Sequence, residues 1–184
     1  MDFQNLLVKI AEILSKLNIP YAVTGGYAVS VWGRPRSTFD VDVIVQLLEP
    51  EAKRLAEALK KISEMSYVDE EMVLRAVERK GEFNFVHIES GIKVDFWVIK
   101  KNDFSQGQLR RRLPKKILGK MVYFISPEDL ILNKLLWYKQ SESSRQLEDV
   151  ESILKISGSK LDKKYLARWT EKLNISSVWR RFKV

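Results

Sequence analysis

Three aspartates stand in segments that otherwise read as β-strands, where Asp is normally rare. Asp40 and Asp42 alternate with apolar residues in Phe39–Val45, and Asp95 lies between apolar residues in Ile92–Val98. Alternation places the carboxylates of Asp40 and Asp42 on one face of a strand, about 7 Å apart at a rise of ~3.3 Å per residue. Gathered like charges are costly unless a cation neutralises them. We therefore predict a metal site formed by Asp40, Asp42 and Asp95.

Composition restricts which metal this site could hold. The chain has no cysteine and a single histidine, which excludes disulfide frameworks, thiolate zinc sites, cysteine nucleophiles and two-histidine metal sites. The remaining ligands are oxygens, and oxygen ligands suit hard divalent cations. We expect Mg²⁺, with Mn²⁺ as the alternative.

A second chemical feature precedes the aspartates. A short apolar run, Tyr21–Val23, is followed by Thr24, Gly25 and Gly26, and Tyr27–Trp32 can form a short helix. Glycine N–H groups at the start of a helix can approach a phosphate closely, and the helix dipole adds to the attraction. A lone Gly-Gly pair is more often only a turn. Its order ahead of the aspartates is what indicates nucleotide chemistry.

The surrounding elements follow from apolar periodicity. Residues at three- and four-residue steps predict amphipathic helices, and alternation predicts strands. The segment 103–120 is polar and basic and is predicted to be a helix and a loop. The predicted helices are 3–17, 50–65, 127–140, 144–157 and 161–173, and the predicted strands are 21–23, 39–45, 83–88, 92–98 and 121–125. The pattern is α/β up to about residue 125 and helical after it.

The chain has 184 residues, which fits one globular domain or one domain with a small appendage. Residues 1–99 carry 12 Lys or Arg and 15 Asp or Glu, whereas residues 100–184 carry 20 and 9. A basic half indicates either contact with a polyanion or simple solubility. The run Arg110–Lys116 and the tail Trp179–Lys183 have the cations and apolar side chains of an RNA contact, and each could equally be an exposed loop or terminus.

The N-terminal region predicts neither a signal peptide nor a membrane span. No basic stretch follows Met1, and the longest uncharged segment, Leu17–Gly33, contains Pro20 and three glycines. We expect a cytoplasmic protein with no membrane partner.

The run from Thr24 to Val43 resembles the signature of the nucleotidyltransferase superfamily of the DNA polymerase β type. That signature is an apolar strand, a Gly-Gly or Gly-Ser pair, about ten to thirteen residues, then two acids alternating with apolar residues, and later a third acid. Gly25 and Gly26 match the pair, and Asp40, Asp42 and Asp95 match the acids.

Within the superfamily, the chain is most similar to the minimal, toxin-type nucleotidyltransferases, the AbiEii-like group. The Gly-Gly opening, the Arg36-x-Thr38-x-Asp40 approach and Lys93-Val94-Asp95 carry this similarity. The segment Ser126–Leu130, with Lys134 and Asp149 after it, resembles the helical C-terminal region of that group.

The resemblance implies a nucleotidyltransferase fold, with a small mixed β-sheet flanked by helices in a catalytic domain of residues 1–125 and a helical C-terminal region of residues 126–184. It implies transfer of a nucleoside monophosphate from an NTP such as ATP to an acceptor hydroxyl, with release of pyrophosphate. By this resemblance, Asp40 and Asp42 would hold two Mg²⁺ ions, and Asp95 would contact the metal on the acceptor side. Gly25 and Gly26 would bind phosphate.

The resemblance also implies that Arg36 and Thr38 contact the triphosphate or the acceptor and that Lys134 contacts the triphosphate. Lys93 and Asp149 would support these residues.

Several acceptors fit this chemistry. RNA, including the 3′ end of tRNA, ranks first because the basic half of the chain would attract its negative charge. A tyrosine or serine hydroxyl of a partner protein comes next, in which case the chain would have a cognate toxin or antitoxin. A small cationic molecule such as an aminoglycoside comes third, because a chain of net charge +8 repels it.

Two functions of other classes remain open. One is a non-catalytic nucleotide- or RNA-binding module that retains the fold. The other is a phosphatase or phosphomutase of the haloacid dehalogenase type, which also carries an Asp-x-Asp pair. That site needs a loop directly after the first Asp, whereas Val43–Val45 continues the strand here, so this alternative ranks low.

Overall fold

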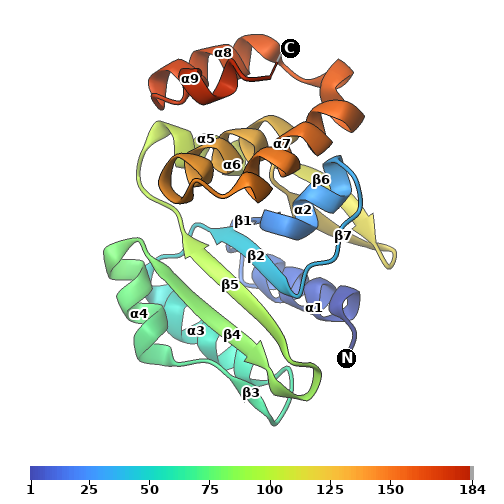
Figure 1. The fold of residues 1–184 in the computed structure, drawn as a ribbon. Coiled ribbons are helices and arrows are strands. Elements are labelled where there is room, and N and C mark those ends of the chain that lie inside the picture. Colours follow the sequence, from blue (N-terminus) through green and yellow to red (C-terminus); the bar gives the residue numbers. More distant parts are fainter. Residues whose placement is uncertain (183–184) are drawn as a thin grey trace. The chain divides into compact units, whose positions relative to one another are not determined.

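The structure is a computed structural model, and it describes residues 1–182. The described residues divide into two compact units. Unit 1 consists of Met1–Tyr27 and Ser37–Ile125, and unit 2 consists of Ala28–Arg36 and the chain from Ser126 onward. Lys183, the last cation of the predicted RNA-contacting tail, lies outside the described residues. Figure 1 shows the elements of both units.

Unit 1 contains a mixed β-sheet, as predicted. Within the described residues the sheet has seven strands in the order β3-β4-β5-β2-β1-β7-β6, so that β3 and β6 form its edges (Figure 1). The pairs β2/β5 and β1/β7 are parallel and the others are antiparallel. The strands are β1 (Tyr21–Thr24), β2 (Asp40–Val45), β3 (Ser66–Tyr67), β4 (Glu82–His87), β5 (Ile92–Val98), β6 (Leu113–Ile117) and β7 (Lys120–Phe124).

Alternation along the strands gives this sheet one apolar face. Phe83 and Phe96 stack on that face with ring centroids 4.8 Å apart. Burying side chains of this size contributes about 1.5–3 kcal/mol each. The other buried residues of this face include Val41, Val43, Val45, Phe85, Val94 and Val98. The opposite face carries the polar residues of the same strands.

Unit 1 has the predicted helices near 3–17 and 50–65, the second of which ends at Lys60, and it adds a helix at Glu70–Arg79 that was not predicted. The first helix is capped by Asp2, whose carboxylate accepts a hydrogen bond from the Asn5 backbone N–H at 2.9 Å. Its buried apolar side chains recur at the predicted three- and four-residue steps. These helices are α1 (Phe3–Lys16), α3 (Glu49–Lys60), α4 (Glu70–Arg79), α5 (Asp103–Arg110) and the 3₁₀ turn η1 (Ile88–Ser90), and the first turn of α2 (Gly25–Trp32) also belongs to unit 1.

The segment 103–120 differs from the prediction. It contains the expected helix α5, but the predicted loop includes strand β6, which pairs with β7. The turn between the strands is Leu118-Gly119, and both residues have positive φ, +47° and +78°. Such a two-residue turn matches the twist of a hairpin. Sequence patterning missed β6 because an edge strand with exposed faces has no apolar alternation.

Unit 2 is helical, and its first long helix starts as predicted. Ser126 caps that helix by accepting a hydrogen bond from the Asp129 backbone N–H at 3.2 Å, and Pro127 occupies the first position. The helices are α6 (Pro127–Ser141), α7 (Ser144–Ser157), the 3₁₀ turn η2 (Gly158–Lys160), α8 (Lys163–Lys172) and α9 (Ser176–Trp179). No helix among the described residues is long and apolar enough to cross a bilayer.

The segment Ala28–Arg36 also belongs to unit 2, although it connects two strands of unit 1 in the sequence. It packs closely against α7. A Cβ atom at Gly33 would clash with the Ser152 hydroxyl, and that hydroxyl accepts a hydrogen bond from the Arg34 backbone N–H at 2.6 Å. Ser157 donates a hydrogen bond to the Trp32 carbonyl. Backbone contact, rather than apolar pattern alone, therefore holds this segment to the helical unit.

Candidate functional site

Four charged residues form a two-by-two group on the polar face of the sheet in unit 1. Strands β2 and β5 pair in parallel, with Asp40 opposite Lys93 and Asp42 opposite Asp95. Residues two apart in a strand share a face, so all four side chains lie on the same side of the sheet. We call these four residues the sheet group. The structure thus brings together the three acids selected from the sequence.

Lys93 is the cation within the sheet group. Its ammonium lies 2.8 Å from Asp95 Oδ2. The hydrogen bond to Asp95 is the main cause of a pKa of Lys93 above the usual 10.5, and the charges of Asp95, Asp40 and Asp42 act in the same direction. Lys93 therefore remains protonated at neutral pH. With all four groups ionised, three carboxylates and one ammonium leave the sheet group with a net charge of −2.

The row that contains Asp42 and Asp95 extends across four strands. Thr24 of β1 lies opposite Asp42, and Asn84 of β4 lies opposite Asp95. Asn84 adds an amide oxygen and an amide N–H₂ to the polar face. Sequence reasoning did not select Asn84. The register of the predicted hairpin 83–98 could have identified it, because a polar residue paired with Asp95 must share its face.

Gly25 permits the close approach of Asp42. The backbone at Gly25 has φ +63°, and a Cβ atom there would overlap the carboxylate of Asp42. Gly25 is also the first residue of α2, so Asp42 lies beside a helix N-terminus, where the dipole favours a negative charge. The structure gives Gly25 a role that the sequence did not predict, namely making room for Asp42. Phosphate binding by Gly25 and Gly26 stays a prediction.

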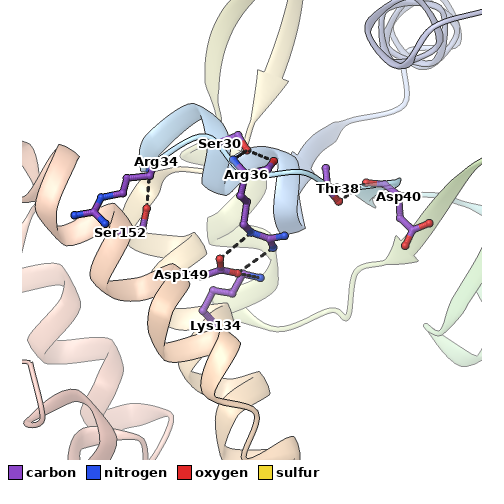
Figure 2. Close-up of polar contacts among 8 residues, drawn as sticks. All are labelled: Ser30, Arg34, Arg36, Thr38, Asp40, Lys134, Asp149 and Ser152. Atoms are coloured by element: carbon purple, nitrogen blue, oxygen red, sulfur yellow. Dashed lines mark hydrogen bonds and ion pairs between the residues drawn. The ribbon is translucent and has the colours of Figure 1, made fainter.

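Thr38 lies in the irregular segment before β2, and its side chain turns toward the backbone. Its hydroxyl donates a hydrogen bond to the Asp40 carbonyl at 3.3 Å, as Figure 2 shows. This contact fixes the approach to β2 where Asp40 is exposed. The predicted contact of Thr38 with triphosphate or acceptor stays a prediction.

The sheet group has the donor chemistry that a hard divalent cation needs: carboxylate oxygens on one face and an excess of negative charge. As they stand, no three Asp, Glu, His or Cys side chains among residues 1–182 converge closely enough to hold a metal ion. The carboxylate of Asp95 is paired with Lys93 instead. A metal ion would therefore compete with the Lys93 ammonium for Asp95.

A second polar group lies within unit 2, and we call it the helical cluster: Arg36, Lys134 and Asp149. The guanidinium of Arg36 donates two hydrogen bonds to Asp149, Nε to Oδ1 at 2.9 Å and Nη2 to Oδ2 at 3.1 Å. Lys134 Nζ lies 2.7 Å from Asp149 Oδ2. Figure 2 shows both cations pointing toward the Asp149 carboxylate.

The helical cluster is buried, unlike the sheet group. The side chains of Asp149 and Lys134 are only 4% and 10% exposed. Lys134 and Asp149, both selected from the sequence, form an ion pair with each other. The sequence did not predict that Arg36 also binds Asp149, from a position 113 residues earlier. Two cations around one carboxylate leave the cluster with a net charge of +1 and tie the segment 28–36 to α6 and α7.

Similarity to other proteins lies in the fold rather than in the sequence. Comparison of the sequence with protein-family models gives no match. Comparison with curated protein sequences also gives no match. Solved structures, in contrast, match over most of the chain.

Three of these structures illustrate the similarity. The antibiotic-resistance factor ANT(2″)-Ia matches with a TM-score of 0.64 at 15% identity, over 97% of this chain and 96% of its own. An antigenic nucleotidyltransferase-like protein from Paracoccidioides brasiliensis matches with a TM-score of 0.55 at 20% identity, over 95% and 90%. The lincosamide antibiotic adenylyltransferase LnuA matches with a TM-score of 0.55 at 15% identity, over 85% and 98%.

These matches agree with the mixed α/β architecture of the chain. The narrower resemblance to the AbiEii-like group stays a prediction. The fold expected from the run Thr24–Val43 is confirmed: the chain has the nucleotidyltransferase fold.

Proposed function

We propose that this chain is a Mg²⁺-dependent nucleotidyltransferase that moves a nucleoside monophosphate from an NTP to an acceptor hydroxyl. The observation that carries the proposal is the sheet group. It places Asp40, Asp42 and Asp95 on one face of two paired strands, with Asp42 beside the first residue of α2. Carboxylates at neighbouring positions of paired strands repel one another and do not stabilise the sheet by themselves. Their arrangement therefore indicates a bound cation.

Asp40, Asp42 and Asp95 would hold the metal in this proposal. When bound, Mg²⁺ supplies a positive charge that stabilises the reacting phosphate oxygens. The acceptor oxygen forms a bond to the α-phosphorus, and the bond from that phosphorus to the oxygen bridging the β-phosphate breaks. Pyrophosphate leaves with the electron pair. The hydroxyl proton passes to the carboxylate of Asp95.

The phosphates of the NTP need cationic or N–H donors from the protein. In unit 1, the backbone N–H groups at the start of α2 and the Lys93 ammonium have the required charge. Binding of the triphosphate by Arg36 and Lys134 of unit 2 stays a prediction, because both cations are paired with Asp149. The exposed fraction of Arg36, 25%, makes it the more accessible of the two cations.

A transfer assay tests the proposal. Purified chain is incubated with Mg²⁺, each α-³²P-labelled NTP, total RNA and a cell lysate, and both labelled products and pyrophosphate are measured. We expect label on one acceptor class and an equal amount of pyrophosphate. Omission of Mg²⁺, or addition of EDTA, should abolish both signals.

Two variants serve as controls for the assay. Asp42→Asn removes one carboxylate of the sheet group and should abolish transfer. Glu57→Gln removes an exposed carboxylate from α3 and should leave transfer unchanged. Binding of NTP without label on any acceptor or release of pyrophosphate would contradict the proposal and favour the non-catalytic binding module.

A further inference from the structure

The hairpin β6–β7 and the residues just before it carry positively charged side chains that have no role in the proposed nucleotide transfer. Between Asp103 and Glu128 the sequence has six Lys or Arg and no Asp or Glu. The cations are Arg110, Arg111, Arg112, Lys115, Lys116 and Lys120. We call residues 110–121 the basic hairpin. Lys120 is paired with Glu12 at 2.9 Å and Arg112 lies over the Tyr123 ring, so the net charge near this sheet edge comes mainly from the other four cations, and an excess of one sign attracts a polyanion.

We propose that the basic hairpin binds single-stranded RNA and presents its end to the sheet group. This inference rests on the proposed function, because it names the acceptor of the transfer. The register of the sheet supports it. Leu113, Phe124, Val23 and Val43 form one row of paired residues across β6, β7, β1 and β2. Asp42 is the neighbour of Val43 in β2, so the start of β6 lies one row away from Asp42.

The basic hairpin and the sheet group therefore belong to one hydrogen-bonded sheet within unit 1. Three strand spacings separate β2 from β6, which is about 14 Å. The start of β6 lies in the row next to Asp42, and the hairpin runs away from that row for about 13 Å to its turn. A strand of RNA lying along β6 would thus have its backbone beside the cations and one end about 14 Å from the strand that carries Asp40 and Asp42.

The hairpin also exposes apolar side chains among its cations. Leu113, Leu118 and Met121 are 40%, 55% and 48% exposed. Leu118 stands in the turn at φ +47°, a conformation that favours Gly or Asn over Leu. An apolar residue at a strained, exposed turn indicates contact with a ligand. Bases provide such a contact, since apolar side chains can pack against their faces.

RNA fits these features better than an acidic protein surface does. The cations follow one extended strand and its approach, which matches a linear polymer with a charge on every unit. The sheet group repels a polyanion through its net charge of −2, so an RNA acceptor needs cations elsewhere on the same unit to hold it. The basic hairpin supplies them.

A binding experiment without NTP tests the inference. Affinity for a fluorescein-labelled single-stranded RNA of about twelve nucleotides, a length within the usual site size, is measured by anisotropy at several salt concentrations. The triple variant Arg110→Gln/Lys115→Gln/Lys116→Gln should lose about tenfold in affinity or more, and the slope of log K against log salt should fall by about 2. A triple variant in unit 2, Lys160→Gln/Lys163→Gln/Lys164→Gln, removes the same charge from exposed positions and should change little. Equal losses in both triple variants would overturn the inference.

The variant Leu118→Asn separates RNA contact from folding. Asn is preferred in this turn, so thermal stability should stay the same or rise. Affinity for RNA should fall by a few-fold, because the apolar contact is gone. Unchanged affinity would remove the assigned role of Leu118.

The inference and the proposed function can fail separately. Asp42→Asn should bind the RNA as the wild type does while transferring no nucleotide. If the wild type labels a protein or a small molecule but not RNA, and the basic hairpin variant binds RNA normally, the transfer chemistry stands and the inference is overturned. If RNA binding depends on the basic hairpin but no acceptor is labelled, the transferase proposal fails instead.

Discussion

The sheet group and the helical cluster use the same kinds of side chain in opposite ways. In the sheet group three carboxylates share one cation, and Asp40 is exposed. In the helical cluster one carboxylate is shared by two cations, and its side chain is 4% exposed. Both are built from residues brought together by the fold. Their burial and their balance of charge differ.

That difference indicates which group stabilises the fold and which one binds a ligand. A buried ion pair must be satisfied by its own partners, because removal of one partner leaves an uncompensated charge. An exposed group with more carboxylates than cations is stabilised when it binds a cation from solvent. We therefore expect substitutions in the sheet group to affect activity and substitutions in the helical cluster to affect folding.

Replacement of Asp42 should give the largest effect on activity. Asp42→Asn should reduce the transfer rate by about 10³-fold or more, which corresponds to the several kcal/mol that a metal centre contributes. Stability should not fall, because Asn keeps the shape and removes like-charge repulsion. Single-turnover transfer and urea unfolding measure the two effects. A transfer rate within tenfold of the wild-type rate would contradict the inference that the sheet group is the ligand-binding group.

Replacement of Asp149 should give the opposite result. Asp149→Ala leaves Arg36 and Lys134 without their carboxylate, and loss of one partner from a buried pair costs about 3–5 kcal/mol. Such a loss is a large share of the stability of a typical domain. Urea unfolding, with unchanged m-value, should show a lower midpoint. If stability is unchanged, the helical cluster is not a structural element, and the two groups are more alike than we infer.

Gly25→Ala should affect both properties, but moderately. The positive φ of Gly25 costs an alanine about 1–2 kcal/mol, and the added Cβ must displace the carboxylate of Asp42. We expect lower stability and weaker metal binding, the latter measured by Mn²⁺ titration. Gly91→Ala is the matched control, because Gly91 also has positive φ but an added Cβ there meets nothing within 4 Å. Equal metal binding by both variants would contradict the positioning role of Gly25.

Lys93→Met should strengthen metal binding. It removes the ammonium that competes for Asp95, and a unit charge at ~4 Å in a solvated site is worth about 1 kcal/mol, or about fivefold in affinity. Because the pKa of Lys93 is raised above 10.5, its ion pair is present below that pH and is lost only as the pH rises through the raised pKa. The gain should therefore be constant between about pH 6 and 9. Weaker Mn²⁺ binding by Lys93→Met would show that Lys93 supports the metal site.

The smallest effect should come from the cap of α1, which belongs to neither group. The hydrogen bond from the Asn5 backbone holds the pKa of Asp2 below its usual 3.8. A lowered pKa means that the cap stabilises the fold above pH 3.8 and that this contribution is lost as the pH falls through the lowered pKa. Asp2→Ala should lower Tm slightly at neutral pH and not at all in strong acid. Thermal unfolding at several pH values tests this.

The sequence predicted the sheet group well because its signal is local. Alternation within β2 and β5 places Asp40 with Asp42 and Lys93 with Asp95 on common faces before any tertiary contact is known. The fold added the parallel register that sets Asp42 opposite Asp95. That register depends on the connection between the strands and cannot be read from either strand alone.

The sequence predicted less of the features that depend on distant contacts. The bidentate pair of Arg36 with Asp149 joins residues with no common periodicity. The assignment of Ala28–Arg36 to unit 2 follows from its backbone contacts with α7. Strand β6 was missed because Leu113–Ile117 contains Pro and two Lys, which are depleted from strands.

The path of the chain between the units has a consequence for synthesis. The residues 28–36 leave the ribosome long before α7 exists, since Asp149 follows Arg36 by 113 positions. At about 5–20 residues per second, this segment waits roughly 6–20 seconds for its partner. During that time its apolar side chains Ala28 and Val29, fully buried in the finished fold, have no helical unit to cover them. Unit 1 can pair its strands before α7 is made, so during this interval the segment between β1 and β2 is open to chaperones and proteases.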